Sequence, residues 1–255
     1  MKIAVVFALP AEFSPWRARH AFRRTNASGR QFYDGRIGPT SLRVAFSGVG
    51  APEMRALADT AFDAPAGLVI SAGIGGGLKP QYRRSDILVA SRLRTTAVDR
   101  TLVLDDRLVS LASRCGATIV DSFVTVDRMI LRAQEKELLG RDADAADMES
   151  FAVISEAGTR GIAGVAIRVV GDTADEDLPL DFTRALRSDH MISVSRVLAE
   201  VALQPGRWPL LLRSGVSYRR ALRELALFLD RFIRALEQAG ARPSNDNPGT
   251  DRDTD

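Results

Sequence analysis

Two acidic residues near the middle of the chain suit acid–base and hydrogen-bonding chemistry. Glu149 stands at the start of a helical pattern, and Asp172 comes shortly after the apolar run 164–170. Such a run is typical of a strand buried on both faces of a parallel sheet, and open α/β sheets bind ligands at the carboxyl ends of their strands. Glu149 could therefore accept hydrogen bonds from a vicinal diol, and a protonated Asp172 could donate its proton to a leaving group.

Both residues also have a purely structural interpretation. A glutamate at a helix N-terminus is favoured by the helix dipole, and an aspartate after a strand is common in turns. Arg168 lies four residues before Asp172 and could pair with a neighbouring carboxylate. Because an ordinary Asp has a pKa of about 3.9, Asp172 would need burial or a nearby negative charge to stay protonated at neutral pH.

The motifs Asp147-Met148-Glu149-Ser150 and Arg168-Val169-Val170-Gly171-Asp172 resemble those of the purine nucleoside phosphorylase and nucleosidase superfamily. The resemblance covers residues 1–203. It implies that Glu149 holds the ribose hydroxyls, with Met148 among the substrate-binding residues. It also implies that Asp172 protonates the purine.

The N-terminal segment adds a third acidic candidate. Residues 3–8 predict a first buried strand with a turn at Pro10, and Glu12 follows. The apolar run is too short, and acidic Glu12 too near, for a signal peptide. The resemblance implies that Glu12 positions an attacking water molecule. The structural alternative is a glutamate that begins a helix after Pro10.

Glycine-rich segments after two predicted strands could bring backbone amides close to a ligand. One contains Val49 after the predicted strand 42–46, and the other contains Gly75 and Gly76 after the strand 67–73. The resemblance places all three residues beside the substrate. Many relatives carry a hydroxyl residue where this chain has Ile74, so phosphate as the nucleophile is in doubt and water is favoured.

The same resemblance implies an apolar pair in the wall that binds the base. Met129 and Ile130 follow a predicted strand at 117–126. In relatives, this segment lines the base pocket with apolar side chains. The alternative is that both are ordinary core residues.

The composition excludes several classes of function. The formal net charge of +3 gives no broad nucleic-acid-binding footprint. The single cysteine, Cys115, cannot form an intrachain disulfide and fits a reducing compartment. His20 and His190 have no metal-ligand spacing. We therefore expect no metal and no cofactor, with phosphate as a possible co-substrate only.

The fold predicted from these patterns is a single α/β domain with a mixed, largely parallel central sheet flanked by helices. The catalytic domain is predicted to span 1–203, a helical extension 204–240 and a disordered tail 241–255. Further predictions are a surface helix and a hairpin around Asp34 and Gly35, and helices at 54–62, 102–114 and 133–139. Strands are predicted at 85–91 and 145–146.

The C-terminal extension is long for the family. We expect a helix at 182–203, a break at Pro205 and a second helix after Ser217. The second helix carries an apolar stripe bordered by arginines. The stripe consists of Tyr218, Leu222, Leu225, Leu229, Phe232 and Leu236. It could pack on the core or on a second subunit, or it could meet a lipid surface.

The segment Thr125-Val126-Asp127-Arg128 and the extension also resemble the hopanoid-associated nucleoside phosphorylases, which act on adenosylhopane. The resemblances together imply cleavage of the N-ribosidic bond of a 5′-substituted adenine nucleoside. The alternatives are phosphorolysis of purine nucleosides, hydrolysis of methylthioadenosine or S-adenosylhomocysteine, and a non-catalytic nucleoside-binding protein at a membrane. The expected partners are a small nucleoside, with or without a lipid tail, and a second copy in a homodimer or larger oligomer. We expect a cytoplasmic location, with possible peripheral contact with the inner face of the membrane.

Overall fold

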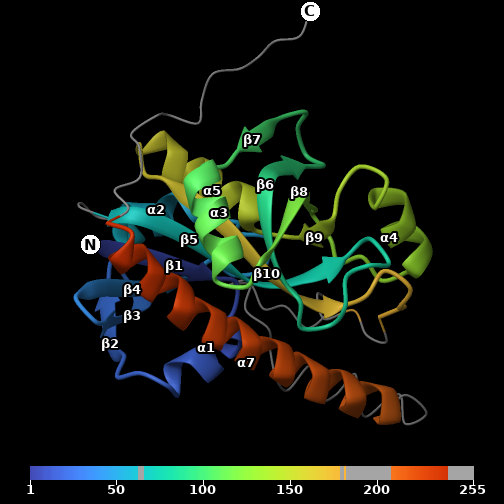
Figure 1. The fold of residues 1–255 in the computed structure, drawn as a ribbon, viewed down its shortest axis with the longest axis horizontal. Helices are drawn as coiled ribbons and strands as arrows, with labels where there is room; N and C mark the ends of the chain where they lie inside the picture. The colour runs from blue at the N-terminus through green and yellow to red at the C-terminus, as the bar shows by residue number, and fades with distance from the viewer. Residues whose placement is uncertain (63–65, 179–180, 182–207, 241–255) are drawn as a thin grey trace, which may run out of the picture.

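A computed structural model of the chain describes residues 1–62, 66–178, 181 and 208–240 (Figure 1). The strands are β1 (Lys2–Phe7), β2 (Arg23–Ala27), β3 (Arg30–Ile37), β4 (Thr40–Phe46), β5 (Ala66–Gly77), β6 (Ile87–Thr95), β7 (Thr101–Val103), β8 (Thr118–Thr125), β9 (Ala145–Asp147) and β10 (Gly164–Asp172). The helices are α1 (Pro10–Arg17), α2 (Met54–Ala61), α3 (Asp106–Arg114), α4 (Ala133–Leu139), α5 (Ser150–Thr159) and α7 (Trp208–Gln238).

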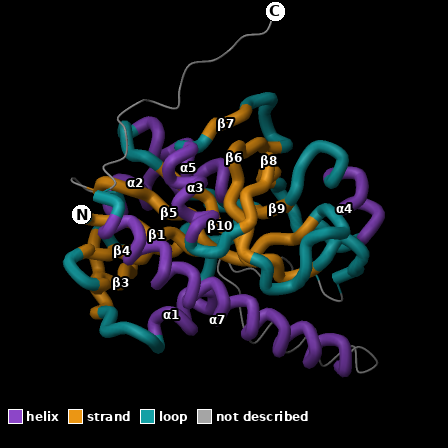
Figure 2. The backbone as a smooth tube through the Cα atoms, viewed as in Figure 1, coloured by secondary structure: helices purple, strands orange, loops and turns teal. Residues whose placement is uncertain are grey.

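All strands join one 10-stranded mixed sheet. Its order is β10-β6-β8-β9-β5-β1-β4-β3-β2, with β7 paired to β6. Because β10 also pairs with β5, the strands β5, β10, β6, β8 and β9 close into a ring. Helices lie around this sheet (Figures 1 and 2). The prediction of a single α/β domain with a mixed central sheet is confirmed.

The strand β10 is buried along its whole length. Every residue from Gly164 to Asp172 is buried. The strand runs parallel to β5 and antiparallel to β6, which explains its nearly continuous apolar sequence. Asp172 is its last residue, at a register shift opposite Gly76. The predicted position of Asp172 at the carboxyl end of a buried strand is therefore confirmed.

The helix α7 packs on the domain along much of its length. It contacts α1, α3 and the strands β3, β5, β6 and β10. Its apolar stripe is buried, with Leu225, Leu229 and Phe232 each at 1% exposure or less. Most of the stripe packs within its own chain, as the first of the alternatives holds, and direct insertion of this face into lipid is excluded.

One acidic residue fastens α7 to α1. Asp230 accepts hydrogen bonds from Trp16 Nε1 at 2.7 Å and from Arg19 Nε at 2.9 Å. His20 Nε2 lies 2.6 Å from the same carboxylate. Although burial opposes ionisation, these three partners hold the pKa of Asp230 below its usual value.

The predicted position of the hairpin turn and the predicted end of one strand were wrong. The hairpin does not turn at Asp34 and Gly35, which lie within β3. It turns between β2 and β3 at Ser28 (φ 49°) and Gly29 (φ 73°), whose left-handed conformations suit a two-residue turn. The strand predicted at 67–73 likewise does not end there: β5 continues to Gly77 because it pairs there with β10 and β9.

Further differences concern element ends. The segment predicted as one helix at 102–114 forms β7 and then α3, whose N-terminus is capped by the Asp105 side chain. The final helix begins at Trp208, not after Ser217. The predicted helix at 182–203, its break at Pro205 and the predicted tail at 241–255 lie outside the described residues.

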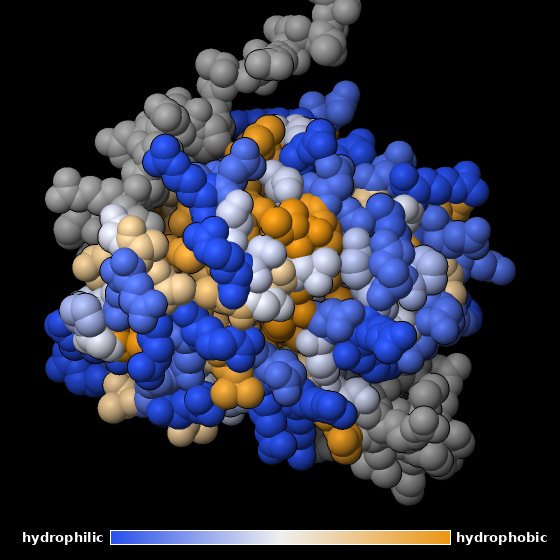
Figure 3. All heavy atoms as spheres, in the orientation of Figure 1, coloured by the Kyte–Doolittle hydropathy of each residue, from blue (hydrophilic) through white to orange (hydrophobic). Residues whose placement is uncertain are grey.

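No helix among the described residues has both the length and the apolar character needed to cross a membrane. On the face drawn in Figure 3, hydrophilic residues cover most of the surface and hydrophobic residues gather in smaller patches.

Candidate active site

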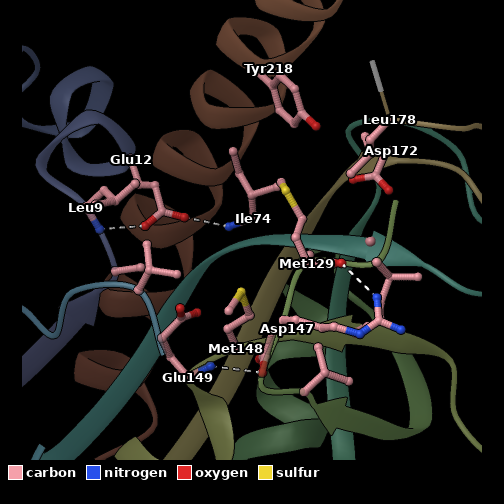
Figure 4. A pocket seen from close by; sticks show the side chains of 18 of the residues that line it. Leu9, Glu12, Ile74, Met129, Asp147, Met148, Glu149, Asp172, Leu178 and Tyr218 are labelled. Carbon is pink, nitrogen blue, oxygen red and sulfur yellow. Dashed lines mark hydrogen bonds between the residues drawn. The ribbon is translucent and has the colours of Figure 1, made fainter. Parts of the chain in front are cut away.

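A pocket of about 400 Å³ lies beside the carboxyl ends of β1 and β10 and against α7. Its lining contains every residue that the sequence predicts for the site. These are Glu12, Val49, Gly75, Gly76, Met129, Ile130, Met148, Glu149 and Asp172. Figure 4 shows Glu12 and Glu149 toward one side of the pocket and Asp172 toward the other, with Ile74 and Met129 between them.

Glu12 lies on the first turn of α1, directly after β1. Its Oε2 accepts the backbone amide of Leu9 at 3.0 Å, and its Oε1 accepts the backbone amide of Ile74 at 2.9 Å. Burial raises its pKa, although these amides and the charge of Arg168 oppose the shift. Glu12 thus has a fixed orientation and a pKa raised toward the range useful to a general base.

Glu149 directly precedes α5 and faces the same end of the pocket. Its Oε1 accepts the backbone amide of Gly50 at 3.0 Å. Burial, followed by the nearby charge of Asp147, raises the pKa of Glu149 to about 8. Gly50 has φ of 76°, a conformation that favours glycine and turns this amide toward the carboxylate. Arg168 Nη2 lies 3.9 Å from Glu149 Oε2. This oxygen can still accept a hydrogen bond from a ligand.

Arg168 is a buried cation behind the pocket. Its Nε lies 2.9 Å from Asp147 Oδ2, and its Nη2 donates to Ser71 Oγ at 3.1 Å. The pairing of Arg168 with a neighbouring carboxylate is therefore confirmed. Asp147 Oδ1 in turn accepts from Thr125 Oγ1 at 2.7 Å and from the backbone amide of Glu149 at 3.2 Å. This network holds the start of α5 in place, and with it Glu149.

Asp172 pairs with a buried lysine at the other end of the pocket. Lys136 Nζ, on α4, lies 2.6 Å from Asp172 Oδ2. Burial raises the pKa of Asp172 above its usual value, even though the Lys136 ammonium opposes the shift. The space at Asp172 depends on Gly76, because a Cβ there would lie 3.2 Å from Oδ2. Asp172 is consequently a buried carboxyl group with an elevated affinity for a proton.

The remaining wall of the pocket is largely apolar. Its apolar members are Leu9, Val49, Ile74, Leu78, Val126, Met129, Ile130, Met148, Leu178 and Leu222. Tyr218 and Leu222 come from α7, so the last helix of the chain forms part of the pocket. Tyr218 reaches the vicinity of Asp172, whose charge adds to burial in raising the pKa of the phenol. An apolar planar or alkyl group would fit such a wall.

The pocket's charges bear on which ligand it could hold. Glu12 and Glu149 make one end acidic, and the Ile74 amide there is already engaged by Glu12. Among the described residues, no group of three or more His, Cys, Asp or Glu side chains could hold a metal ion. An anion such as phosphate would find neither a free amide nor a side-chain hydroxyl at Ile74.

Sequence reasoning missed Lys136, Leu178 and the two pocket residues of α7 as members of the site. Lys136 carried no signal in the sequence, because its burial results from the fold and not from the pattern of its own short helix. Tyr218 and Leu222 were recognised only as part of an apolar stripe. Leu178 lies in a loop without any periodicity that could have revealed it.

Comparison with known protein families gives one match that covers most of the chain. The family model described as the Phosphorylase superfamily matches residues 2–204. This span contains all the predicted site residues, together with Lys136 and Leu178. It ends before α7.

Solved structures share the fold at low sequence identity. Futalosine hydrolase of Helicobacter pylori strain 26695 matches with a TM-score of 0.67 and 18% identity, covering 94% of this chain and 98% of the other. The 5′-methylthioadenosine/S-adenosylhomocysteine nucleosidase of S. pneumoniae, with a transition-state inhibitor, matches with a TM-score of 0.69 and 17% identity, covering 92% and 100%. A variant of the H. pylori nucleosidase with 5′-methylthioadenosine in its active site matches at 0.65 and 18%, covering 93% and 98%.

Proposed function

Since this chain belongs to the Phosphorylase superfamily, we propose that it is an enzyme that hydrolyses the N-ribosidic bond of a 5′-substituted adenine nucleoside. The observation that carries this proposal is the division of the pocket. Two hydrogen-bonded carboxylates, Glu12 and Glu149, lie at one end, and the buried acid Asp172 lies at the other. A nucleoside needs the same division, with the sugar at one end and the base at the other.

In this proposal Glu149 binds the sugar. The two ribose hydroxyls donate to its carboxylate, which also favours the positive charge that develops on the ring. Ligand hydroxyls would stabilise the ionised form, against the burial that raises the pKa of Glu149. Met148, Val49, Gly75 and Gly76 also line the pocket and would contact the substrate, with Gly76 against Asp172 at the base end.

Asp172 acts as the general acid. Its O–H bond breaks as an N–H bond forms on the purine, and the electron pair of the ribosyl–purine bond passes into the base. Glu12 orients a water molecule and accepts its proton as oxygen bonds to the anomeric carbon. The apolar Met129 and Ile130 contact the base. The products are the free base and a free sugar.

Water is the proposed nucleophile because of the surroundings of Glu12. The Ile74 side chain has no hydroxyl to offer an oxyanion, and its amide already donates to Glu12. Arg168, the cation nearest to Glu149, is paired with Asp147. Phosphorolysis is therefore the less favoured reaction, although it remains the second candidate for the family.

The 5′ substituent is proposed to be apolar and compact. Leu9 lies beside Glu12 and Leu222 lines the same pocket, and a volume of about 400 Å³ lies at the small end of the range for ligand sites. Methylthioadenosine fits this description, because its methylthio group is small and apolar, whereas the homocysteinyl group of S-adenosylhomocysteine is longer and charged. Adenosylhopane is a further candidate, favoured by the wall that α7 contributes, but its ring system would have to extend out of the pocket.

The test is base release from a panel of nucleosides, followed by chromatography. The panel contains adenosine, methylthioadenosine, S-adenosylhomocysteine, futalosine, adenosylhopane in detergent and a series of 5′-alkylthioadenosines, each assayed with and without phosphate. We expect adenine and a free sugar from the 5′-substituted adenosines, at a rate independent of phosphate. Strict phosphate dependence with a sugar 1-phosphate product would replace hydrolysis by phosphorolysis. Binding of the panel without release of any base would favour a non-catalytic nucleoside-binding protein.

A further inference from the structure

Lys136 is buried in a way that calls for an explanation. Only 1% of it is exposed, and a lysine is rarely buried unless its charge is paired. Besides Asp172, its ammonium donates to the backbone carbonyls of Thr173 and Glu176, each at 2.8 Å. All three N–H groups therefore have acceptors, and the cation has a fixed position against Asp172 Oδ2.

From this geometry we infer that Lys136 is a positioning residue for the proton donor: its ammonium stabilises the Asp172 carboxylate that forms when the purine takes the proton. The inference rests on the proposed function, because it needs Asp172 to be the acid. It adds a residue and a role that neither the sequence motifs nor the family match supplies.

The physical reason lies in the burial of Asp172. Burial alone holds the proton on this carboxyl group and makes its conjugate base costly. Such an acid holds its proton before the reaction, but the free energy needed to transfer that proton to the purine is high. An ammonium at 2.6 Å offsets this cost, and the attraction is stronger in a water-poor site than in bulk water. No proton leaves Lys136; Asp172 recovers its proton from solvent after the base departs.

Other charged and titratable groups also face Asp172, but none of them is as close a partner. Arg84 donates to the carbonyl of Gly171 and pairs with Glu176 at 2.8 Å. The Glu176 carboxylate opposes the effect of Arg84 at Asp172. Tyr218, from α7, is neutral at ordinary pH because its pKa is raised. Lys136 is thus the cation that responds directly to the charge on Asp172.

A purely structural role for Lys136 makes different predictions. Its two carbonyl contacts help to hold the loop 173–178. That loop has further attachments: Asp177 accepts the backbone amide of Ala133 at 2.8 Å, and the Leu178 amide donates to the Leu131 carbonyl at 2.8 Å. A lysine that served only this loop would affect all substrates equally.

The test compares two leaving groups in the wild type, Lys136→Met and Lys136→Arg. One substrate is the best nucleoside of the panel, and the other is 4-nitrophenyl riboside, whose leaving group needs no proton. We expect Lys136→Met to lose ~10²-fold in kcat on the nucleoside and little on the nitrophenyl substrate. Lys136→Arg should recover most of the nucleoside rate. Lys79→Met is the matched control, since Lys79 forms its ion pair with Asp144, away from Asp172.

A pH profile gives an independent measurement on the nucleoside alone. Loss of the ammonium should raise the pKa of Asp172, so the alkaline limb of kcat/KM should move upward by ~1 pH unit or more in Lys136→Met. Equal losses on both substrates with an unmoved limb, or full nucleoside activity in Lys136→Met, would overturn the inference alone. A wild type that releases no base from any nucleoside would overturn the proposed function, and this inference with it.

Discussion

Glu12 Oε1 accepts a hydrogen bond from the backbone amide of Ile74 at 2.9 Å, across a distance of 62 positions in the sequence. The contact joins the first turn of α1 to β5 and occupies an amide that could otherwise face an anion. In the proposed mechanism, it fixes the carboxylate that orients the attacking water. Ile74 and Glu12 therefore have to be considered together.

The first prediction concerns the nucleophile. Ile74→Ser adds a hydroxyl beside Glu12, yet leaves the carboxylate and the engaged amide in place. We expect the wild type to be insensitive to phosphate and Ile74→Ser to gain at most a weak phosphate-dependent activity. Isotopic labelling with ¹⁸O water measures this, since hydrolysis places the label in the sugar. Absence of label from the wild-type sugar product would contradict the role given to Glu12.

The second prediction concerns Asp172. Asp172→Asn keeps the size of the side chain but removes the acid, so kcat on a nucleoside should fall ~10²-fold or more. Substrate binding, measured by calorimetry, should change much less. Asp175→Asn is the matched control, because Asp175 is exposed in the following loop and contacts only its neighbour Thr173 among the pairs described. Near-normal turnover in Asp172→Asn would remove Asp172 from the mechanism.

The third prediction concerns stability and pH. In the folded protein the pKa of Glu149 is about 8, against 4.5 in the unfolded chain. Between these values the folded state holds a proton that the unfolded state has lost, so stability should fall as the pH rises from about 4.5 to about 8. Glu149→Gln cannot ionise and escapes this cost. Its Tm relative to the wild type should therefore rise over that window and level off above it.

Thermal unfolding at a series of pH values measures this effect. Exposed Glu137 provides the control, and Glu137→Gln should show a Tm difference that stays nearly constant. A Tm difference for Glu149→Gln that is flat across the window would show that Glu149 ionises normally in the folded protein.

The fourth prediction concerns the attachment of α7. Asp230→Ala leaves the buried Trp16 indole N–H without its acceptor, at a cost on the order of 2 kcal/mol in the free energy of unfolding. Urea unfolding measures the loss. Glu224→Ala, on the same helix, should cost far less. An Asp230→Ala protein as stable as the wild type would mean that apolar packing alone holds α7.

The fifth prediction concerns the 5′ substituent. Leu222 lines the pocket, so Leu222→Ala should enlarge its apolar end and improve kcat/KM for butylthioadenosine relative to methylthioadenosine by ~10-fold. Leu225→Ala is a matched control, because Leu225 is buried on the same helix but does not line the pocket. The same shift in both variants would contradict a direct role for Leu222.

Much of the site was predictable because its residues sit at element ends with clear local signals. Asp172 ends an uninterrupted apolar run, and Glu149 precedes a helix. Other features depend on contacts between segments far apart in the sequence. The continuation of β5 through its glycines requires pairing with β10 and β9, and no local pattern indicates such pairing.

The partner of Asp172 was not predictable for the same reason. Lys136 lies 36 positions earlier, on a helix whose own periodicity gives no hint of a pocket. The sequence indicates that the stripe on α7 is apolar, but periodicity alone does not indicate what the stripe packs against. In the structure α7 packs against α1, and Asp230 attaches the helix through its hydrogen bond with Trp16.

In the proposed function, α7 contributes Leu222 to the pocket wall, while Asp172, Glu12 and Glu149 lie on other elements. A substitution at Leu222 can therefore alter which tail is accepted while the residues proposed for bond cleavage stay in place. Natural selection or protein engineering can therefore change the range of accepted 5′ substituents through substitutions on α7. By the same logic, an inhibitor that discriminates this protein from its relatives should carry its distinguishing groups at the end that meets this helix.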